Sequence, residues 1–402
     1  MRILTVSTFF PNSANPHRTV FVKNLVRAMQ ARCTLSVVAP MPYVPAIPQL
    51  PHWYAQSRIG RREDVDGIEV LHPRFLVLPR MHWCSGLTYF LGVVSLLRQV
   101  KHDHGACLIH VHCAYPDGVG VALAARVLRL PFVITVHGSD INVYAAQRVL
   151  KPQIRWALGA ANGVIAVSSD LEDKVRRLTY GSVKRLVCIP CAGFDPAMFF
   201  PRPLADCRAA RDLPPGARIV VFVGNLVPIK GVEFLVEAWA LLSRRGILGD
   251  EDRLVIVGEG RCRTELERCA EAAGIGPRVK FTGAIPQIEV SCWVAAASLL
   301  CLPSHNEGMP NVVVEALATG IPVVSTRVGG IPELIREGVN GLLVAPGKSG
   351  VLADALAAAM TRSWDRNEIR SSVAHLTWQA LADRNCEFLD SVVSEAKRAS
   401  AS

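Results

Sequence analysis

The chain has 402 residues, half of them hydrophobic and 19% charged, a composition that excludes a disordered protein and a length that predicts two or three domains. No apolar run reaches the roughly 18–20 residues of a membrane helix, and the opening MRILTVSTFF is typical of a first strand, so we expect neither an integral membrane protein nor a secreted one. The formal net charge is +10, and residues 1–196 account for all of it, with 22 Lys and Arg against 11 Asp and Glu.

The first half alternates apolar runs, which are typical of buried parallel strands, with segments of helical spacing. The stretch from Met41 to Pro51 holds too many prolines for either element, so we expect a loop there. The predicted strands are Ile3–Val6, Leu35–Ala39, Cys107–Val111, Phe132–Val136, Val164–Val167 and Arg185–Ile189, and the predicted helices are Phe21–Ala31, Val119–Leu128, Gln147–Ala160 and Leu171–Leu178.

The second half repeats this alternation, and the pattern becomes purely helical after about Met360. The predicted strands are Ile219–Val223, Leu254–Val257, Val279–Thr282, Leu299–Leu302, Val323–Ser325 and Leu342–Val344, and the predicted helices are Val232–Leu242, Thr264–Ala273, Gln287–Ala296, Val312–Ala318 and Val351–Met360.

Strand–helix alternation in both halves predicts an α/β protein with two Rossmann-like, doubly wound domains that face a cleft. We expect the first domain to span residues 1–199 and the second to span residues 218–362, with a proline-rich linker, residues 200–217, between them. A C-terminal helical segment, residues 363–402, should pack back towards the first domain. Ligands of such sheets bind beyond the carboxyl ends of the strands, so functional residues should follow strands.

A glycine- and lysine-containing loop follows the first predicted strand of the second half. Gly224 and Asn225 come directly after that strand, and Lys230 precedes the next helix. Backbone amides at a helix start favour an anion, and the Lys230 ammonium adds a full positive charge. Because the segment lacks the Walker pattern, phosphate binding and a surface lysine beside a turn are about equally expected.

Two carboxylates, Glu307 and Glu315, lie eight residues apart across a strand–loop–helix corner. Carboxylates accept strong hydrogen bonds from paired sugar hydroxyls, and the amides of Gly308, Met309 and Asn311 are free to donate at the helix start. Glu315 sits in the apolar run VVVEALA, where a buried carboxylate without a partner would be costly. We therefore favour a binding role over a capping glutamate and an unrelated surface glutamate.

Histidines and cysteines give weaker signals. His137 follows a predicted strand, within TVHGSD, and is well placed to reach a reacting centre, although a lone loop histidine is more often structural. His110 and His112 alternate along the preceding strand and should share one face, but two histidines without a third ligand do not make a metal site. Cys188 and Cys191 lack a second pair at zinc spacing, so we expect reduced, buried thiols.

The segment EGMPNVVVEALATGIPVVST resembles the signature of the retaining GT-B glycosyltransferases of family 4, whose paired glutamates are matched by Glu307 and Glu315. GNLVPIKG resembles the phosphate loop of that family and IPCAGFDPAMFFP its inter-domain segment, while AVSSDL, VTVHGSD and VHCAYPDG match further positions. The similarity spans nearly the whole chain. It looks closest to bacterial enzymes that build cell-wall or exported polysaccharides, such as the teichuronic-acid type.

The resemblance implies transfer of a hexose or N-acetylhexosamine, with retained configuration, from a nucleotide diphosphate such as UDP to a glycan or lipid-linked acceptor, with no cofactor and no metal. Glu315 would bind the ribose, Glu307 the sugar hydroxyls and Lys230 the diphosphate. The implied catalytic residues are His137, Lys230 and Glu307. The implied donor-binding residues are Gly224, Asn225, Lys230, Glu307, Gly308, Met309, Asn311 and Glu315, and those on the acceptor side are Thr19, His112 and Asp140.

Three positions depart from the family pattern. Asn225 stands where an arginine is common, Cys191 replaces an asparagine, and Thr19 stands where a glycine precedes the first helix. A β-carbon at Thr19 restricts the backbone and would crowd the diphosphate. These departures leave a catalytically silent sugar-nucleotide-binding subunit open as an alternative, and the shared architecture leaves a GT-B epimerase or phosphorylase open.

The expected chemistry follows from the absence of an obvious nucleophile. Since both glutamates are assigned to binding, we expect a front-face substitution in which the leaving phosphate accepts the proton of the acceptor. No carboxylate pair suited to a divalent metal follows a strand, which predicts metal independence.

The basic first half predicts an anionic partner, either a lipid headgroup or a membrane surface, although solvated arginines explain it equally well. Nucleic acid is disfavoured because aromatic residues make up only 6% of the chain. Residues 83–97, flanked by Arg80, Arg98 and Lys101, fit an interfacial amphipathic helix or a buried one. We expect a cytoplasmic protein that works at the inner face of the plasma membrane.

Overall fold

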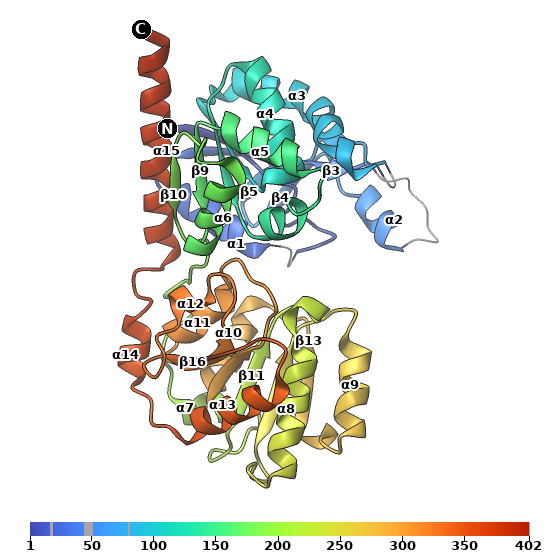
Figure 1. Cartoon of the computed structure of the whole chain (residues 1–402), viewed down its shortest axis with the longest axis vertical. Helices are drawn as coiled ribbons and strands as arrows, with labels where there is room; N and C mark the ends of the chain where they lie inside the picture. Colours follow the sequence, from blue (N-terminus) through green and yellow to red (C-terminus); the bar gives the residue numbers. More distant parts are fainter. Residues whose placement is uncertain (17–18, 44–50, 79–80, 402) are drawn as a thin grey trace. The chain divides into compact units, whose positions relative to one another are not determined.

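The computed structural model describes residues 1–16, 19–43, 51–78 and 81–401 (Figure 1), and their contacts divide the chain into two compact units. The first unit comprises residues 1–191 together with the chain from Trp378 onwards, and the second comprises Ala192–Thr377. Each unit is built on its own, mainly parallel sheet with helices packed against it. This confirms the predicted α/β architecture of two Rossmann-like domains.

The first unit contains an eight-stranded sheet in the order β10-β9-β8-β7-β1-β2-β5-β4, and β3 and β6 pair separately. Neighbouring strands are parallel except β4 and β5, which form an antiparallel hairpin at one edge. The strands are β1 Arg2–Val6, β2 Thr34–Val38, β3 Met41–Pro42, β4 Arg62–Val65, β5 Ile68–Leu71, β6 Arg74–Phe75, β7 Leu108–His112, β8 Phe132–Val136, β9 Gly163–Ala166 and β10 Leu186–Cys188.

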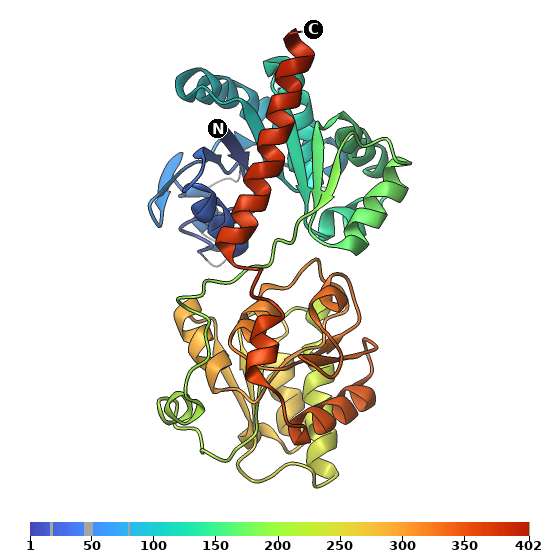
Figure 2. The same cartoon turned by 90° about the vertical axis from the view of Figure 1, so that its left-hand side faces the viewer.

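The helices of the first unit include the last one of the chain, α15, which packs on α1 and runs along this unit (Figure 2). Arg32 and Asp383 form an ion pair of 3.0 Å beside that contact. The helices are α1 Val20–Met29, α2 Pro51–Ser57, α3 Ser85–His104, α4 Val119–Leu128, α5 Lys151–Ala160, α6 Ser169–Thr179 and α15 Trp378–Ala401, with short helical turns η1 His82–Cys84, η2 Ala114–Gly118 and η3 Asp140–Tyr144.

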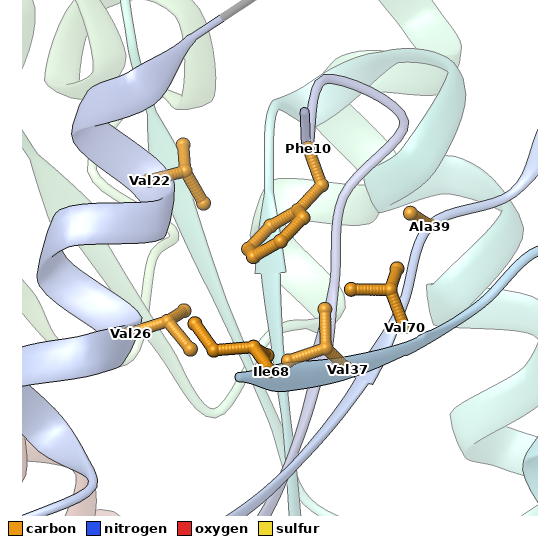
Figure 3. Close-up of a cluster of buried hydrophobic side chains, with 7 residues drawn as sticks. All are labelled: Phe10, Val22, Val26, Val37, Ala39, Ile68 and Val70. Carbon is orange, nitrogen blue, oxygen red and sulfur yellow. The ribbon is translucent and has the colours of Figure 1, made fainter. Parts of the chain in front are cut away.

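A buried cluster of the first unit fixes the start of the loop that follows β1. Phe10, which lies in that loop, is 1% exposed and packs between α1 and the sheet (Figure 3). Its ring replaces water contacts with apolar ones, which stabilises this end of the loop by about 2 kcal/mol. The other members of the cluster are Val22, Val26, Val37, Ala39, Ile68 and Val70.

The second unit contains a six-stranded, wholly parallel sheet in the order β13-β12-β11-β14-β15-β16. The strands are β11 Ile219–Val223, β12 Arg253–Val257, β13 Val279–Gly283, β14 Leu299–Leu302, β15 Val323–Thr326 and β16 Gly341–Val344. The helices are α7 Leu204–Ala209, α8 Val232–Arg244, α9 Arg263–Ala272, α10 Gln287–Ala296, α11 Asn311–Ala318, α12 Ile331–Leu334, α13 Ser349–Thr361 and α14 Arg366–Ser371, with turns η4 Pro228–Lys230 and η5 Gly276–Arg278.

The structure differs from the predicted organisation in two places. The predicted linker, residues 200–217, lies inside the second unit and includes α7, and the predicted tail splits, with α14 in the second unit and α15 in the first. The predicted loop from Met41 to Pro51 begins in β3 and ends at the first residue of α2, while residues 44–50 lie outside the described part of the chain.

The segment around residues 83–97 forms η1 and most of α3, which has one buried and one exposed face. Arg80, which was expected to flank it, lies outside the described residues. None of the helices in the described residues combines the length and the hydropathy of a membrane span.

Candidate functional site

Two loops at the carboxyl ends of neighbouring strands β11 and β14 touch in the second unit. The His305 amide donates to the carbonyl oxygen of Ile229 across 2.8 Å. Gly231, which precedes α8, has φ 61°, and a β-carbon there would overlap the carbonyl oxygen of Pro303. Only glycine combines this left-handed backbone with so close an approach. The lysine loop and the glutamate loop therefore form one continuous structure.

Lys230 and Glu307 form an ion pair where these loops meet. The Lys230 Nζ atom lies 2.6 Å from Glu307 Oε1, and the side chains are only 22% and 10% exposed. The hydroxyl of Ser304, itself fully buried, donates to the same carboxylate oxygen across 2.6 Å. The structure thus joins two residues that are 77 positions apart in the chain and that were predicted to act on neighbouring parts of one ligand.

A third loop, between β15 and α12, contacts the backbone at Glu307 and Gly308. The Gly330 amide donates to the carbonyl oxygen of Gly308 across 2.8 Å. Gly329 has φ 53°, and a β-carbon there would overlap the carbonyl oxygen of Glu307. The backbone that carries the carboxylate is therefore held on two sides, which restricts where the side chain can point.

Glu315 has a partner of its own. It lies one turn inside α11, is 6% exposed, and accepts a hydrogen bond of 3.0 Å from Nε2 of Gln287 on α10. Burial raises the pKa of Glu315 from 4.5 to about 7, and the Gln287 bond offsets this only in part. A neutral amide stabilises a buried carboxylate less than a cation does, so the site still favours further hydrogen-bond donors.

The other predicted donor-binding residues have diverse surroundings. Asn225 is exposed, Met309 is buried, and Gly224 has an extended backbone with φ 158°. The side chain of Asn311 accepts a hydrogen bond of 3.2 Å from the Gly193 amide, which occupies it within the second unit. Of these residues, Asn311 therefore has an evident structural role.

Three histidines of the first unit lie together in β7 and at the carboxyl end of β8. His110 and His112 share one face, as predicted, with ring centroids 4.4 Å apart, and His112 stacks on His137 at 5.2 Å. His112 Nδ1 and His137 Nε2 lie 3.0 Å apart, at hydrogen-bond distance. Burial lowers the pKa of His110 to about 4 and that of His137 to about 3, and it also lowers the pKa of His112 well below its usual value. All three imidazoles are therefore neutral near pH 7.

Asp140 organises the backbone around this stack. Its buried carboxylate accepts hydrogen bonds from the amides of Ala114, His137, Gly138 and Ile141, at distances between 2.9 and 3.4 Å. These bonds tie the loop after β7 to the loop after β8, so Asp140 positions His137. Burial raises the pKa of Asp140, although the amide bonds act against this shift.

Thr19 directly precedes α1 and has a left-handed backbone, at φ 43° and ψ 47°, without a side-chain cap of the helix. Glycine favours this conformation and a β-branched residue does not, which agrees with the glycine that the resemblance led us to expect there. The Thr19 hydroxyl donates to the carbonyl oxygen of Phe9, and this bond helps to hold the conformation.

Sequence reasoning gave no role to three residues of these sites. Ser304 and Gln287 each donate to a predicted glutamate. Asp117 is buried after β7, accepts from the Thr8 amide at 2.6 Å and from the Tyr89 hydroxyl at 3.0 Å, and has its pKa raised to about 6 by burial. Ser304 and Asp117 both follow predicted strands, which is the signal that could have identified them.

Known protein families match both halves of the chain. Residues 217–362 match the family model described as glycosyl transferases group 1, and residues 19–193 match the one described as glycosyltransferase family 4. The chain is 31% identical to a Bacillus subtilis protein named as a teichuronic acid biosynthesis glycosyltransferase, TuaC, over 89% of this chain and 88% of that one. It is 30% identical to alpha-D-kanosaminyltransferase of Streptomyces kanamyceticus, over 73% and 76% of the two chains.

Solved structures share the fold. Sucrose-phosphate synthase of Thermosynechococcus elongatus has a TM-score of 0.75 at 22% identity, covering 98% of this chain and all of that one. HepE of Anabaena in complex with UDP-glucose has a TM-score of 0.69 at 22% identity, covering 97% of this chain and all of that one.

Proposed function

The chain belongs to the group 1 glycosyltransferases of family 4, and we propose that it transfers a hexosyl or N-acetylhexosaminyl group from a nucleotide-diphosphate donor to a hydroxyl of a glycan or lipid-linked acceptor, with retained anomeric configuration. The family membership makes the chain a glycosyltransferase of the GT-B type. The donor, the stereochemistry and the acceptor are the parts that we propose.

The ion pair between Lys230 and Glu307 carries the proposal. A nucleotide sugar offers an anionic diphosphate next to a hydroxylated ring, and these two residues offer a cation next to a carboxylate at 2.6 Å. Glu315, with its raised pKa, gains two donors when ribose hydroxyls reach it. HepE, which has the same fold, has been solved in complex with UDP-glucose. This complex supports UDP as the first nucleotide to test.

In the proposed reaction, the bond between the anomeric carbon and the diphosphate oxygen breaks while the acceptor oxygen attacks from the same face. The leaving phosphate oxygen takes the proton of the acceptor hydroxyl, and Lys230 stabilises the negative charge that develops on the diphosphate. Glu307 holds the sugar hydroxyls, so catalysis rests on positioning and electrostatics. His137, on the acceptor side, is held by Asp140 and His112 as a neutral hydrogen-bonding group. The transfer needs no divalent metal.

We propose that the acceptor is a glycan of a surface polysaccharide, because the B. subtilis relative is named for teichuronic acid biosynthesis. Thermal-shift screening of nucleotide sugars identifies the donor, since a ligand that binds only the native state raises its stability. Transfer to glycan acceptors is then followed with and without EDTA, and the anomeric configuration of the product is determined by NMR. Loss of turnover with EDTA that Mg²⁺ or Mn²⁺ restores would contradict metal independence.

The same assays distinguish the competing functions. A silent subunit, which the left-handed Thr19 and the uncharged Asn225 would suit, binds UDP but neither transfers nor slowly hydrolyses the donor. An epimerase isomerises the donor, and a phosphorylase cleaves glycan only when phosphate is present.

A further inference from the structure

Helix α3 lies on the outside of the first unit (Figure 1). An exposed apolar stripe runs along this helix and the turn η1 that precedes it. Trp83, Leu87 and Leu91 are 51%, 53% and 64% exposed and are spaced four residues apart, while the opposite face of α3 is buried. At 3.6 residues per turn, Arg98 falls within about 40° of Leu87 and Leu91 around the helix axis. One line on α3 therefore passes from large apolar side chains to an exposed cation.

A basic pocket adjoins the second half of the same helix. It has a volume of about 490 Å³, and its lining includes Arg61, Arg62 and Arg74 together with Ser95 and Gln99 of α3. Arg74 donates to the carbonyl oxygen of Ile59 at 2.5 Å, and burial and the charge of Arg61 lower its pKa. The lowered pKa shows that the charged form of Arg74 is destabilised in this pocket, and a bound anion would stabilise it.

Carboxylates neutralise these cations only in part, although the charge of Glu63 acts on Arg74. Arg62 pairs with Glu69 at 3.0 Å, and Asp103, which also lines the pocket, pairs with His102 at 3.0 Å. In the described part of the chain, Arg61 and Arg98 form no ion pair. Residues 1–196 together have a net charge of +11, which exceeds that of the whole chain.

We propose that this surface, made of Trp83, Leu87, Leu91, Arg98 and the pocket arginines, docks on an anionic phospholipid bilayer, with the apolar stripe in the interfacial region and a lipid phosphate in the basic pocket. An interfacial helix has this combination of an exposed apolar line and flanking cations. The charge of the first half is complementary to an anionic leaflet, and each arginine near such a surface contributes about 1 kcal/mol. The inference does not depend on the proposed sugar transfer, because it uses no residue of the glutamate site in the second unit or of the histidine cluster in the first.

Vesicle binding by the full chain tests this inference. Sedimentation with phosphatidylcholine vesicles is compared with sedimentation with vesicles that contain phosphatidylglycerol. Arg61→Gln/Arg98→Gln should lower the partition coefficient for the anionic vesicles about 30-fold, which is the effect of two charges of about 1 kcal/mol each. Leu87→Ser/Leu91→Ser should lower it about tenfold, since two exposed side chains lose part of their burial.

Matched controls keep the result specific. Arg244→Gln/Arg261→Gln removes two exposed cations of the second unit, and Val127→Ser/Val149→Ser removes two exposed apolar side chains of the first unit outside α3. Neither control should change the partition coefficient. All of the substituted residues are exposed or half exposed, so the melting temperatures should match that of the parent chain.

Three results would overturn the proposal. The first is that Arg61→Gln/Arg98→Gln and Leu87→Ser/Leu91→Ser both have the partition coefficient of the parent chain, and the second is no preference for anionic vesicles. The third is a dimer in light scattering that Leu87→Ser/Leu91→Ser dissociates without any effect on vesicle binding, because the stripe would then be a contact between two copies of this chain.

Discussion

Oε1 of Glu307 accepts hydrogen bonds from both the Lys230 ammonium and the Ser304 hydroxyl, each across 2.6 Å. The cation that should meet a diphosphate therefore already has a carboxylate partner within the protein. A diphosphate must compete with Glu307 for Lys230, and the carboxylate that it displaces becomes free to accept from sugar hydroxyls. If Lys230 binds the diphosphate and Glu307 the sugar, as proposed, the two binding events are coupled through this one pair.

Lys230→Ala should lower the turnover number about 100- to 1000-fold, because the developing negative charge on the leaving diphosphate loses its cation. The fold should survive, since Ser304 still donates to Glu307. Steady-state kinetics of transfer measure the effect, with circular dichroism as the check on folding. Lys348→Ala, which removes an exposed lysine of the same unit, is the control and should leave the turnover number unchanged. An active, folded Lys230→Ala variant would remove Lys230 from the mechanism.

Glu307→Gln should separate the two binding functions. UDP, which has no sugar to bind, should bind several-fold more tightly because Lys230 loses its competing carboxylate, while sugar transfer should fall. Isothermal titration calorimetry with UDP measures the first effect and the transfer assay measures the second. Glu251→Gln, an exposed glutamate of the same unit, controls for the change in net charge. Weaker binding of UDP would show that Glu307 does not compete for Lys230.

Glu315→Gln should change how the stability of the chain depends on pH. Glu315 is buried and its folded-state pKa is about 7, above the ordinary 4.5. The contribution of Glu315 to the free energy of unfolding is therefore complete below about pH 4.5. It falls as the pH rises to about 7, and above that pH it no longer changes. The loss should be on the order of 3 kcal/mol.

Urea unfolding at pH 5 and pH 8 measures the pH dependence of the free energy of unfolding. Glu315→Gln should remove the contribution of Glu315 and leave that of the buried histidines and Asp117 unchanged. The comparison uses the difference between the two pH values, so any constant effect of the substitution cancels. Identical pH dependence in the parent chain and the variant would mean that Glu315 is ionised at ordinary pH.

His110→Gln should reduce acid destabilisation. Burial lowers the folded-state pKa of His110 to about 4, so its neutral form is stabilising above an unfolded-state pKa of about 6.5, and that stability is lost as the pH falls from 6.5 to 4. This histidine alone should contribute on the order of 3 kcal/mol to the loss. Unfolding curves at several pH values measure it. An equally steep acid loss in His110→Gln would leave the effect to other groups.

The buried parallel strands could be predicted closely from the sequence. The prediction for β8, β11 and β14 matches the structure residue by residue, because strands covered on both faces are continuous apolar runs. The hairpin of β4 and β5 was not predicted. It lies at the sheet edge, where polar and apolar residues mix, although Asp66 and Gly67 at its turn, both with positive φ, are a hairpin signal.

The predicted site residues lie at the ends of the strands where they were expected, but their partners could not be predicted. Lys230 and Glu307 meet across 77 positions, and Gln287 reaches Glu315 from a different helix. Such contacts depend on which strands are neighbours in the sheet. The doubly wound strand order expected for a Rossmann-like domain does place β11 beside β14. The contacts also depend on the conformations of the two loops, which could not be predicted from the sequence.

The packing of α15 on α1 has a consequence for biosynthesis. During translation, the ribosome releases α1 early and α15 only after the whole of the second unit, residues 192–377, has emerged. The side of α1 that meets α15 stays uncovered for most of that time. We therefore expect a holdase chaperone to bind the nascent first unit more than the second.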